Sequence, residues 1–309
     1  MKTVGILSNL HEKCGSADHG RYLAKELRHY YNVLLSDKGP ELSGCDVVII
    51  NWHPARIKLT DEMVRGFQRL GSKVIVIYQN TLGVNTVERI SSLDLADAVI
   101  THEPISRPTE VIPVGIWIVK GLAEKVEPMI GTAGFPFPWK QLEITAGVAK
   151  SLGVKYRLMA PYYDYDKEAE DLPGYIKGIS DILGPLADIH NEWLPVEDVI
   201  RELSECAVNV FWFNSQGLGA LQGQSGSVRI GLAARRPIII SRHRKFTTLF
   251  PYEDELYIAD TVEQVREFAE GILQAPEKAK RPKRILSEMG WPAAGRKHAV
   301  LIERLTNGA

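Results

Sequence analysis

Short runs rich in Val and Ile alternate with helix-like segments along almost the whole chain. Runs such as Val74–Ile77 contain no polar residue, so both faces of these strands must be buried, as in a parallel sheet covered by helices. The pattern predicts an α/β fold whose first third forms a Rossmann-like domain. Its expected strands are Val4–Leu7, Val33–Leu35, Asp46–Ile50, Lys73–Tyr78 and Ala98–Ile100, with helices at Tyr22–Tyr30, Glu62–Leu70 and Val87–Leu93.

The alternation is interrupted once and then resumes. The break begins at Val111–Gly115, and a charged stretch from Lys120 to Glu127 follows it, so we place the linker here. Two Rossmann-like domains are therefore expected, at residues 1–118 and 119–309. In the second, the expected strands are Pro128–Ile130, Tyr156–Met159, Ala187–His190, Ala207–Phe213, Pro237–Ile240 and Leu256–Ala259. Its expected helices are Lys140–Leu152, Leu172–Leu183, Val196–Ser204, Val228–Ala234, Val262–Leu273 and His298–Leu305.

Composition excludes several classes of protein. The 37 Lys and Arg residues nearly balance 38 Asp and Glu residues, so no overall field attracts nucleic acid or an anionic membrane. The three cysteines have no ligand spacing, which indicates neither a disulfide framework nor a zinc site. The first apolar run is too short for a signal peptide and no run is long enough to span a membrane, so a cytoplasmic location is expected.

Loops that follow the expected strands of the first domain carry candidate binding residues. Gly15 and Ser16 stand where a helix begins, and their backbone N–H groups could face a phosphate or sugar oxygen. A capped turn would explain this loop equally well. His53, Gln79 and His102 follow later strands, where imidazole and amide groups suit a ligand rich in hydroxyls. Each histidine could instead be a structural residue.

Two loops of the second domain predict an anion site. Gly134 allows close approach of the backbone, and Lys140 near a helix start is placed to neutralise a diphosphate. A glycine-proline turn with a solvated lysine is the alternative. A second glycine-rich loop ends at Ser225, Gly226 and Ser227, where the start of another helix would bind an anion. No GxGxxG pattern is present, so a nicotinamide-dependent dehydrogenase is not supported. The basic run Arg242–Lys245 is interpreted as a solvated rim.

Four motifs resemble those of GT-B glycosyltransferases, in particular the retaining glycosyl transferases group 1 family (GT4-like). They are Cys14–Ala17, Ile112–Gly115, Gly131–Gly134 with Lys140, and Ser225–Arg229 with Leu232–Pro237. The resemblance covers almost the whole chain and implies two Rossmann-like domains facing across a cleft. The N-terminal domain would bind the acceptor and the C-terminal domain the donor, with the C-terminal helix crossing back to the first domain.

The activity implied is transfer of a hexose or pentose from a nucleotide-diphosphate sugar, of the UDP or GDP type, to a hydroxyl acceptor. In such enzymes the lysine contacts the donor diphosphate, and transfer needs neither a bound metal nor another cofactor. Catalysis with retention needs no enzymic base. If the reaction inverts instead, the base would be His53, His102 or Asp18.

The sequence also departs from the family pattern. The family's E-x7-E carboxylates would fall at Gln222 and Ile230, its histidine after the fourth strand corresponds to Gln79, and an arginine that often precedes the lysine is missing. Gln79 and Gln222 could still hydrogen-bond sugar hydroxyls. These changes suit a divergent enzyme, or a binding protein for nucleotide sugars or glycans that has lost catalysis. A transferase acting on modified DNA bases is a third hypothesis, with a local positive surface formed by Arg56, Lys58, Arg242, Arg244 and Lys245.

Overall fold

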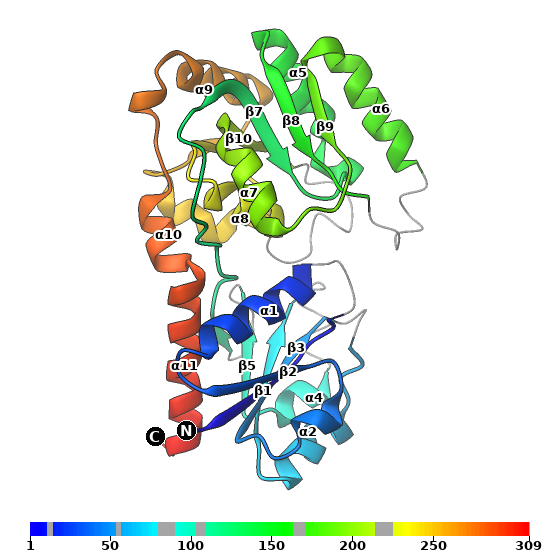
Figure 1. The fold of residues 1–309 in the computed structure, drawn as a ribbon, viewed down its shortest axis with the longest axis vertical. Helices are drawn as coiled ribbons and strands as arrows, with labels where there is room; N and C mark the ends of the chain where they lie inside the picture. Colours follow the sequence, from blue (N-terminus) through cyan, green and yellow to red (C-terminus); the bar gives the residue numbers. More distant parts are fainter. Residues whose placement is uncertain are drawn as a thin grey trace. The chain divides into compact units, whose positions relative to one another are not determined.

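A computed structural model describes residues 1–10, 15–53, 57–79, 90–102, 109–162, 171–213 and 225–308 (Figure 1). The described residues form two compact units. Residues 1–115 and 289–308 make up the first unit, and residues 116–213 and 225–288 make up the second. Candidate residues Gln222 and Arg56 lie outside the described residues.

The first unit contains a six-stranded parallel sheet in the order β2-β1-β3-β4-β5-β6. Lys73–Tyr78 and its neighbours pair in register along the sheet, with Val47 opposite Lys73 and Trp52 opposite Tyr78. Every paired strand is parallel, as the Val and Ile runs predict. The strands are β1 (Thr3–Leu7), β2 (Asn32–Ser36), β3 (Val47–Trp52), β4 (Lys73–Tyr78), β5 (Ala98–Thr101) and β6 (Glu110–Val111).

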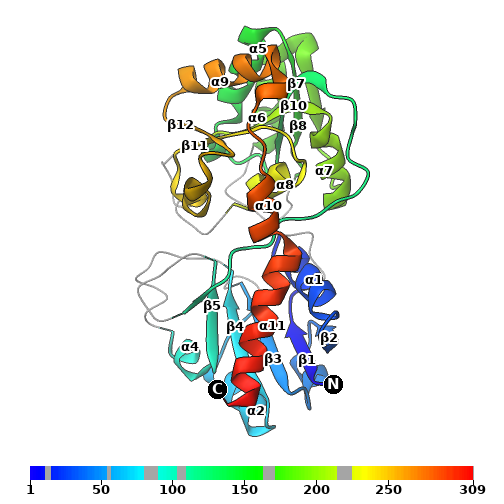
Figure 2. The same ribbon diagram turned by 90° about the vertical axis from the view of Figure 1, so that its left-hand side faces the viewer.

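Helices cover both faces of this sheet (Figures 1 and 2). Side chains of β3 and β4 pack on one face with α2 (Asp61–Arg69) and α4 (Ser91–Leu95). On the other face lie α1 (Gly15–Leu27) and α11 (Trp291–Asn307). The helices pack closely, since a Cβ at Gly295 would lie 2.8 Å from Glu26 Cβ. The C-terminal helix is therefore part of the first unit's core.

The second unit repeats this architecture with a sheet in the order β12-β11-β10-β7-β8-β9. Its strands are β7 (Glu127–Ala133), β8 (Lys155–Met159), β9 (Ala187–His190), β10 (Cys206–Phe211), β11 (Ile238–Ser241) and β12 (Tyr257–Ala259). One apolar core packs under α5 (Leu142–Leu152), α6 (Leu172–Leu183) and α9 (Val262–Gln274). The opposite face carries α7 (Val196–Ser204) and α8 (Gly226–Ala233), and α10 (Lys283–Met289) follows α9 in the chain.

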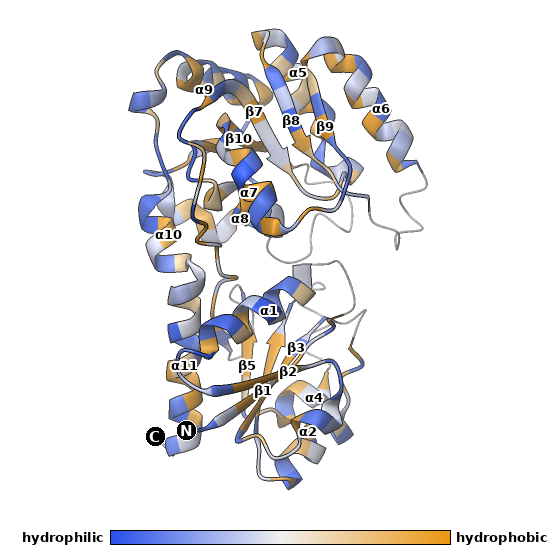
Figure 3. Ribbon diagram, in the orientation of Figure 1, coloured by the Kyte–Doolittle hydropathy of each residue, from blue (hydrophilic) through white to orange (hydrophobic). Residues whose placement is uncertain are grey.

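Hydropathy follows this layering. Strands β1, β3 and β5 are coloured mostly hydrophobic, whereas α1, α6 and α11 alternate between hydrophobic and hydrophilic residues (Figure 3). That alternation is typical of helices with one face in the core. Among the described residues, no helix combines the length and apolar character needed to cross a bilayer.

Most expected elements occur within a few residues of their sequence positions. The C-terminal helix is longer than expected, because it begins at Trp291 rather than His298. The basic stretch near Lys283 was not expected to be helical but contains α10. The short strand β6 was missed because two residues carry no periodic signal. The helix expected at Val87–Leu93 falls partly outside the described residues.

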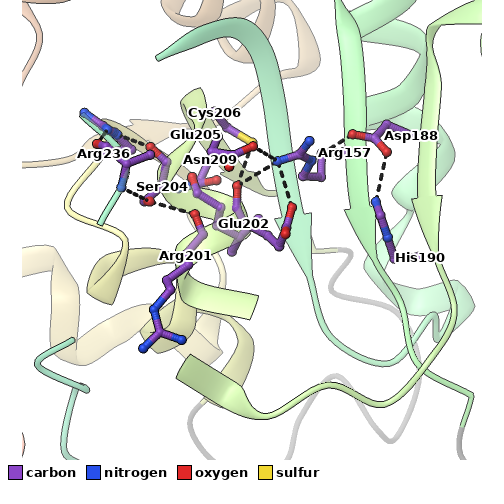
Figure 4. Close-up of polar contacts among 12 residues, drawn as sticks. Arg157, Asp188, His190, Arg201, Glu202, Ser204, Glu205, Cys206, Asn209 and Arg236 are labelled. Carbon is purple, nitrogen blue, oxygen red and sulfur yellow. Dashed lines mark hydrogen bonds and ion pairs between the residues drawn. The ribbon is translucent and has the colours of Figure 1, made fainter. Parts of the chain in front are cut away.

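An ion-pair cluster around Arg157 joins β8, β9 and the end of α7 (Figure 4). Arg157 Nε donates to Asp188 Oδ2 at 2.8 Å, and Nη1 donates to Glu205 Oε2 at 2.6 Å. Nη1 also donates to the Glu202 carbonyl at 3.1 Å, near the end of the helix, where the same carbonyl accepts from the Glu205 N–H at 3.2 Å. The Arg157 side chain is 12% exposed, so water screens this cluster only in part. His190 extends the cluster on the β9 side, where its Nε2 lies 2.9 Å from Asp188 Oδ1.

We expect Arg157→Leu to lower the unfolding free energy by about 2–4 kcal/mol at neutral pH, because the carboxylates of Asp188, Glu202 and Glu205 lose their shared cation. Burial by itself raises the pKa of Asp188. Hydrogen bonds from Arg157 and His190, together with the charge of Arg157, outweigh this effect and hold the pKa below its usual value. A carboxylate whose pKa is lowered by folding stabilises the folded state at pH values above its unfolded-state pKa. This stabilisation is lost as the pH falls through the folded-state pKa. The difference between wild type and variant should therefore shrink below about pH 4.

Urea unfolding at several pH values measures this difference. Arg201→Leu is the matched control, since Arg201 pairs with Asp198 on the exposed surface of α7 and should contribute less than about 1 kcal/mol. Equal losses for the two variants would contradict the prediction.

Candidate functional site

In each unit the strand order changes direction at one point. In the second unit, β8 and β9 follow β7 in sequence and lie on one side of it in the sheet. The next strand, β10, lies on the other side of β7. Ligands of open parallel sheets bind beyond the carboxyl ends of strands at such a point. In the second unit this position is occupied by the loop after β7, by Phe213 and by the start of α8.

Gly134, Lys140 and Ser227 meet at this switch point. Gly134 has a φ of +110°, a left-handed conformation that favours glycine, and its N–H donates to the Met159 carbonyl at 2.9 Å. Lys140 ends a short 3₁₀ helix, Pro138–Lys140, and its Nζ donates to Ser227 Oγ at 3.2 Å. A Cβ at Gly134 would overlap Ser227 Oγ and lie 2.8 Å from Lys140 Nζ. The absent side chain thus leaves room for the lysine head beside the helix start.

The first turn of α8 supplies the second half of this arrangement. Ser225 occupies the N-cap position with an extended backbone, but its side chain makes no capping hydrogen bond. Gly226 is the first helical residue, and no atom of the described residues lies within 4 Å of a Cβ built on it. Helix N-terminal N–H groups carry partial positive charge, so they favour an anion next to Lys140.

Lys140 is surrounded by aromatic rings rather than by water. It is 4% exposed, and its Nζ lies 5.8, 5.6 and 5.7 Å from the ring centres of Phe137, Trp139 and Phe213. Burial, helped by repulsion from Lys245, lowers the pKa of Lys140 to about 7. No carboxylate of the described residues forms an ion pair with Lys140. An anionic ligand would therefore restore the full charge of this lysine.

The interpretation of the basic run Arg242–Lys245 as a solvated rim is wrong for two of its four residues. Arg242 and Arg244 are exposed, but His243 and Lys245 are buried at 4% and 9% exposure. Lys245 Nζ lies 5.0 Å from the centre of the Trp139 ring. Sequence reasoning missed this residue because four consecutive basic and imidazole side chains are typical of a surface. The sequence signal that could have indicated its burial is its position in the short segment after the buried strand Ile238–Ser241.

The first unit has a polar ladder at its own switch point, between β1 and β3. Asn51 Nδ2 donates to Ser8 Oγ at 2.9 Å and to the Ser16 carbonyl at 2.8 Å. Gln79 Nε2 in turn donates to Asn51 Oδ1 at 2.5 Å. Gly20 makes room for this ladder, since a Cβ there would overlap Ser8 Oγ. The ladder fixes the first turn of α1 against three strand ends, and thereby brings Ser16 and Gln79 together.

Asn51→Leu should lower the unfolding free energy by about 2–4 kcal/mol, because three hydrogen bonds are lost and buried polar partners stay unsatisfied. Asn51 is 1% exposed, so water cannot replace the amide. Chemical unfolding of the variant measures the loss. Asn32→Ala, at an exposed position of β2, is the control and should change stability by less than about 0.5 kcal/mol. A loss no larger than that of the control would contradict the ladder's role.

The remaining candidates of the first unit lie in different surroundings. Gly15 is the first residue of α1, and in the part of the chain that the structure describes no atom lies within 4 Å of a Cβ built on it. His53 follows β3 and is half-buried, and its carbonyl accepts from Ile57 N–H at 3.0 Å. His102 is buried, with Nδ1 2.8 Å from the Ile112 carbonyl and its ring centre 5.1 Å from that of His19. The His102 side chain therefore lies in the interior of the first unit.

Metal-ligating side chains do not gather in the described part of the chain. No group of three or more His, Cys, Asp or Glu residues there could hold a metal ion. Cys45 and Cys206 are free and buried.

Solved structures share this architecture. Sucrose-phosphate synthase from Thermosynechococcus elongatus aligns with a TM-score of 0.68 at 13% identity, covering 100% of both chains. Anabaena HepE in complex with UDP gives 0.58 at 12% identity, covering 100% of this chain and 98% of that one. An α-glucosyltransferase in complex with UDP and a 13-mer DNA gives 0.59 at 11% identity, covering 96% and 94%. The chain has the GT-B fold.

At these identities the likeness establishes the fold alone. No protein-family model matches the sequence, and no curated protein matches it either. The GT-B fold places the carboxyl ends of β7 and β10 at the position where α/β sheets bind ligands. The function must therefore be argued from the residues found there.

Proposed function

We propose that this GT-B protein is a glycosyltransferase that moves a sugar from a nucleotide-diphosphate sugar to a hydroxyl acceptor. One observation carries the proposal: Lys140 is buried beside the start of α8 without a carboxylate partner among the described residues. A diphosphate is the ligand that suits a buried lysine next to helix N–H groups. The glycosyltransferases that share the fold, some of them solved with UDP, support the same donor class. UDP and GDP sugars are the donors to test first.

Lys140 and the first turn of α8 would act on the leaving group. As the bond between the sugar C1 and the diphosphate oxygen breaks, its electron pair moves to that oxygen, and the ammonium and helix amides stabilise the new charge. The acceptor oxygen forms the new bond to C1, and its proton passes to the departing phosphate oxygen. We propose retention on this basis, because no enzymic base is required. The lysine and amides offset the charge that a metal offsets elsewhere, so we propose transfer without a metal.

Gly15, Ser16, Gln79 and His53 belong to the first unit, and we propose that they contact the acceptor or the donor sugar. Gln79 is half-buried and uses its amide nitrogen on Asn51, so its carbonyl oxygen stays available to accept from a hydroxyl. Gln222, in the position of a family carboxylate, would hydrogen-bond the donor sugar. His102 would serve as a base only if the reaction inverts.

DNA is a second candidate acceptor, favoured by the DNA-bound glucosyltransferase of the same fold. The local positive surface expected to bind DNA has fewer free, exposed basic side chains than the sequence predicts. Arg242 pairs with Asp260 at 2.8 Å, and Lys245 is buried. Lys58 and Arg244 are exposed. We therefore propose a sugar or small-molecule hydroxyl as the acceptor ahead of a modified base.

A screen of nucleotide-diphosphate sugars tests the proposal. Binding stabilises the folded state by mass action, so the correct donor should raise the melting temperature and slowly release its nucleotide. Both effects should be lost in Lys140→Met and retained in Lys150→Met, whose lysine is exposed on α5. Stabilisation without release, with acceptors present, would indicate a binding protein. Salt-sensitive retention on DNA would instead favour the DNA acceptor. No response to any donor would contradict the proposal.

A further inference from the structure

Gln141 has a backbone conformation that is unfavourable for a residue with a side chain, and it directly follows the buried lysine. Among the described residues, Gln141 and Arg235 alone combine a side chain with a positive φ, at 46° and 57°. Such left-handed residues cost free energy and persist only where the surrounding structure holds them. Gln141 is the C-cap of the 3₁₀ helix Pro138–Lys140 and also the N-cap of α5. Its conformation therefore sets the direction in which the chain leaves Lys140.

Hydrogen bonds fix the chain on both sides of Gln141. Its own N–H donates to the Pro138 carbonyl at 3.0 Å. The next N–H, that of Leu142, donates to the Tyr175 hydroxyl at 2.9 Å, which fastens the start of α5 to α6. Because α5 is fixed at this end, a change in the turn must be taken up on the side of Lys140.

A side-chain hydrogen bond holds Gln141 in the left-handed conformation. Trp212 Nε1, from the segment after β10, donates to Gln141 Oε1 at 3.1 Å. Both side chains are half-buried, and Trp212 packs against the apolar core under α5, α6 and α9. An indole ring held by such packing is a fixed anchor for its N–H group. The hydrogen bond therefore fastens the turn to the end of the sheet.

The residues next to this pair also contact one another. Phe213 follows Trp212, and the centre of its ring lies 5.7 Å from Lys140 Nζ. Consecutive residues at the end of a strand point to opposite faces of a sheet. Trp212 therefore holds Gln141 on the α5 side, and Phe213 borders the lysine head on the α8 side. There Lys140 Nζ donates to Ser227 Oγ at 3.2 Å, so the turn determines where the ammonium group lies.

We propose that Gln141 is a positioning residue, whose hydrogen bond to Trp212 holds the turn that keeps the Lys140 ammonium at the first turn of α8. The inference rests on the proposed function, because it assumes that Lys140 acts on the leaving diphosphate. In this role Gln141 contacts neither the donor nor the reacting atoms. It prevents the lysine head from turning out to water, so the positive charge is already in place when the bond between sugar and diphosphate breaks.

The pKa of Lys140, followed by NMR of its side chain in the full chain, tests the inference without a donor. Gln141→Met keeps the length of the side chain but removes the acceptor, and Trp212→Phe keeps a ring but removes the N–H. In each variant the pKa should rise from about 7 to about 8 or higher, because the released lysine head regains water. The double variant should show no larger rise than either single variant, since the two side chains act through one hydrogen bond.

Two glycine variants separate positioning from backbone strain. Gln141→Gly removes the cost of the positive φ, so this variant should fold, but it lacks the side chain and should show the same rise in the pKa of Lys140. Arg235→Gly is the matched control, because Arg235 has the same kind of strain but precedes β11, at the opposite end of the sheet. It should leave the pKa of Lys140 unchanged. An unchanged pKa in both Gln141→Met and Gln141→Gly, or additive effects in the double variant, would overturn the inference.

Sugar transfer links the turn to the proposed function. With UDP or GDP sugars as donors, the kcat of Gln141→Met should fall about tenfold while the KM for the donor changes less than about threefold. The reason is that a displaced ammonium still attracts the bound diphosphate but no longer meets the charge that develops on it. A wild-type kcat in this variant would overturn the inference and leave the proposed function intact. If the wild type uses no nucleotide-diphosphate sugar, the proposed function fails, and the role of Gln141 in transfer fails with it.

Discussion

Lys140→Met should lower the rate of sugar transfer about 10²–10³-fold and at the same time stabilise the ligand-free protein. The activity falls because a preorganised cation no longer meets the charge that develops on the leaving diphosphate. The stability rises because the variant no longer buries a lysine head that is 4% exposed. Methionine has a similar length and fills the space between the Phe137, Trp139 and Phe213 rings.

The gain in stability should depend on pH. The pKa of Lys140 is lowered to about 7 in the folded state, mainly by burial and also by Lys245, from 10.5 for an unperturbed lysine. The unfolded state binds more protons between these values, so the contribution of Lys140 to the unfolding free energy rises with pH across this window. The advantage of Lys140→Met should therefore be greatest at pH 7 and below, at about 2–3 kcal/mol, and small near pH 10.

Thermal unfolding from pH 6 to 10 measures this, with Lys150→Met as the exposed-lysine control. A variant that is both inactive and less stable at pH 7 would indicate that Lys140 holds the loop together rather than waiting for an anion. That result would contradict the account of the lysine.

Gly134→Ala should abolish donor binding and lower the unfolding free energy by about 2–4 kcal/mol. Two effects combine at this position. Its φ of +110° is unfavourable for any residue with a side chain, and the added Cβ would overlap Ser227 Oγ. The lysine head lies 2.8 Å from the same Cβ, so Lys140 or the start of α8 must move. Donor affinity should fall at least about 100-fold as a result, because misplaced charges lose most of their effect.

Gly147→Ala is the matched control. Gly147 is an exposed residue of helix α5, and among the described residues no atom lies within 4 Å of a Cβ built on it, so alanine should raise the unfolding free energy by about 0.5–1 kcal/mol. Donor titration and urea unfolding of both variants give the comparison. Normal donor binding by Gly134→Ala would show that the ligand does not depend on the close approach of Gly134, Ser227 and Lys140.

The fold could be predicted from the sequence because local signals and burial agree. Runs such as Val74–Ile77 are apolar without alternation, and parallel strands buried on both faces require that pattern. Glycines at strand ends marked the turns, and Gly134 has the positive φ that its place suggests. Helix α10 lacked such a signal, since the basic run around Lys283 is typical of a loop.

The site could be predicted only where its residues are close in sequence. Gly134 and Lys140 lie six positions apart after one strand, so their pairing was accessible. The burial of Lys245 could not be predicted in this way. It results from the segments after β7, β10 and β11, which bring Trp139, Phe213 and Lys245 together. His102 shows the opposite case: its place after a strand suggested a ligand, but the side chain turns inward to the Ile112 carbonyl. The direction of a side chain depends on tertiary packing, which one loop sequence does not specify.

Proton uptake on nucleoside diphosphate binding tests the central claim most directly. At pH 8, Lys140 is mostly neutral in the ligand-free protein, since its pKa is lowered to about 7. A diphosphate bound against it should raise that pKa, so calorimetry in buffers of different ionisation enthalpy should show uptake of up to about one proton per site. Lys140→Met should take up none. Tight binding without proton uptake, or equal uptake by wild type and Lys140→Met, would show that the diphosphate lies elsewhere.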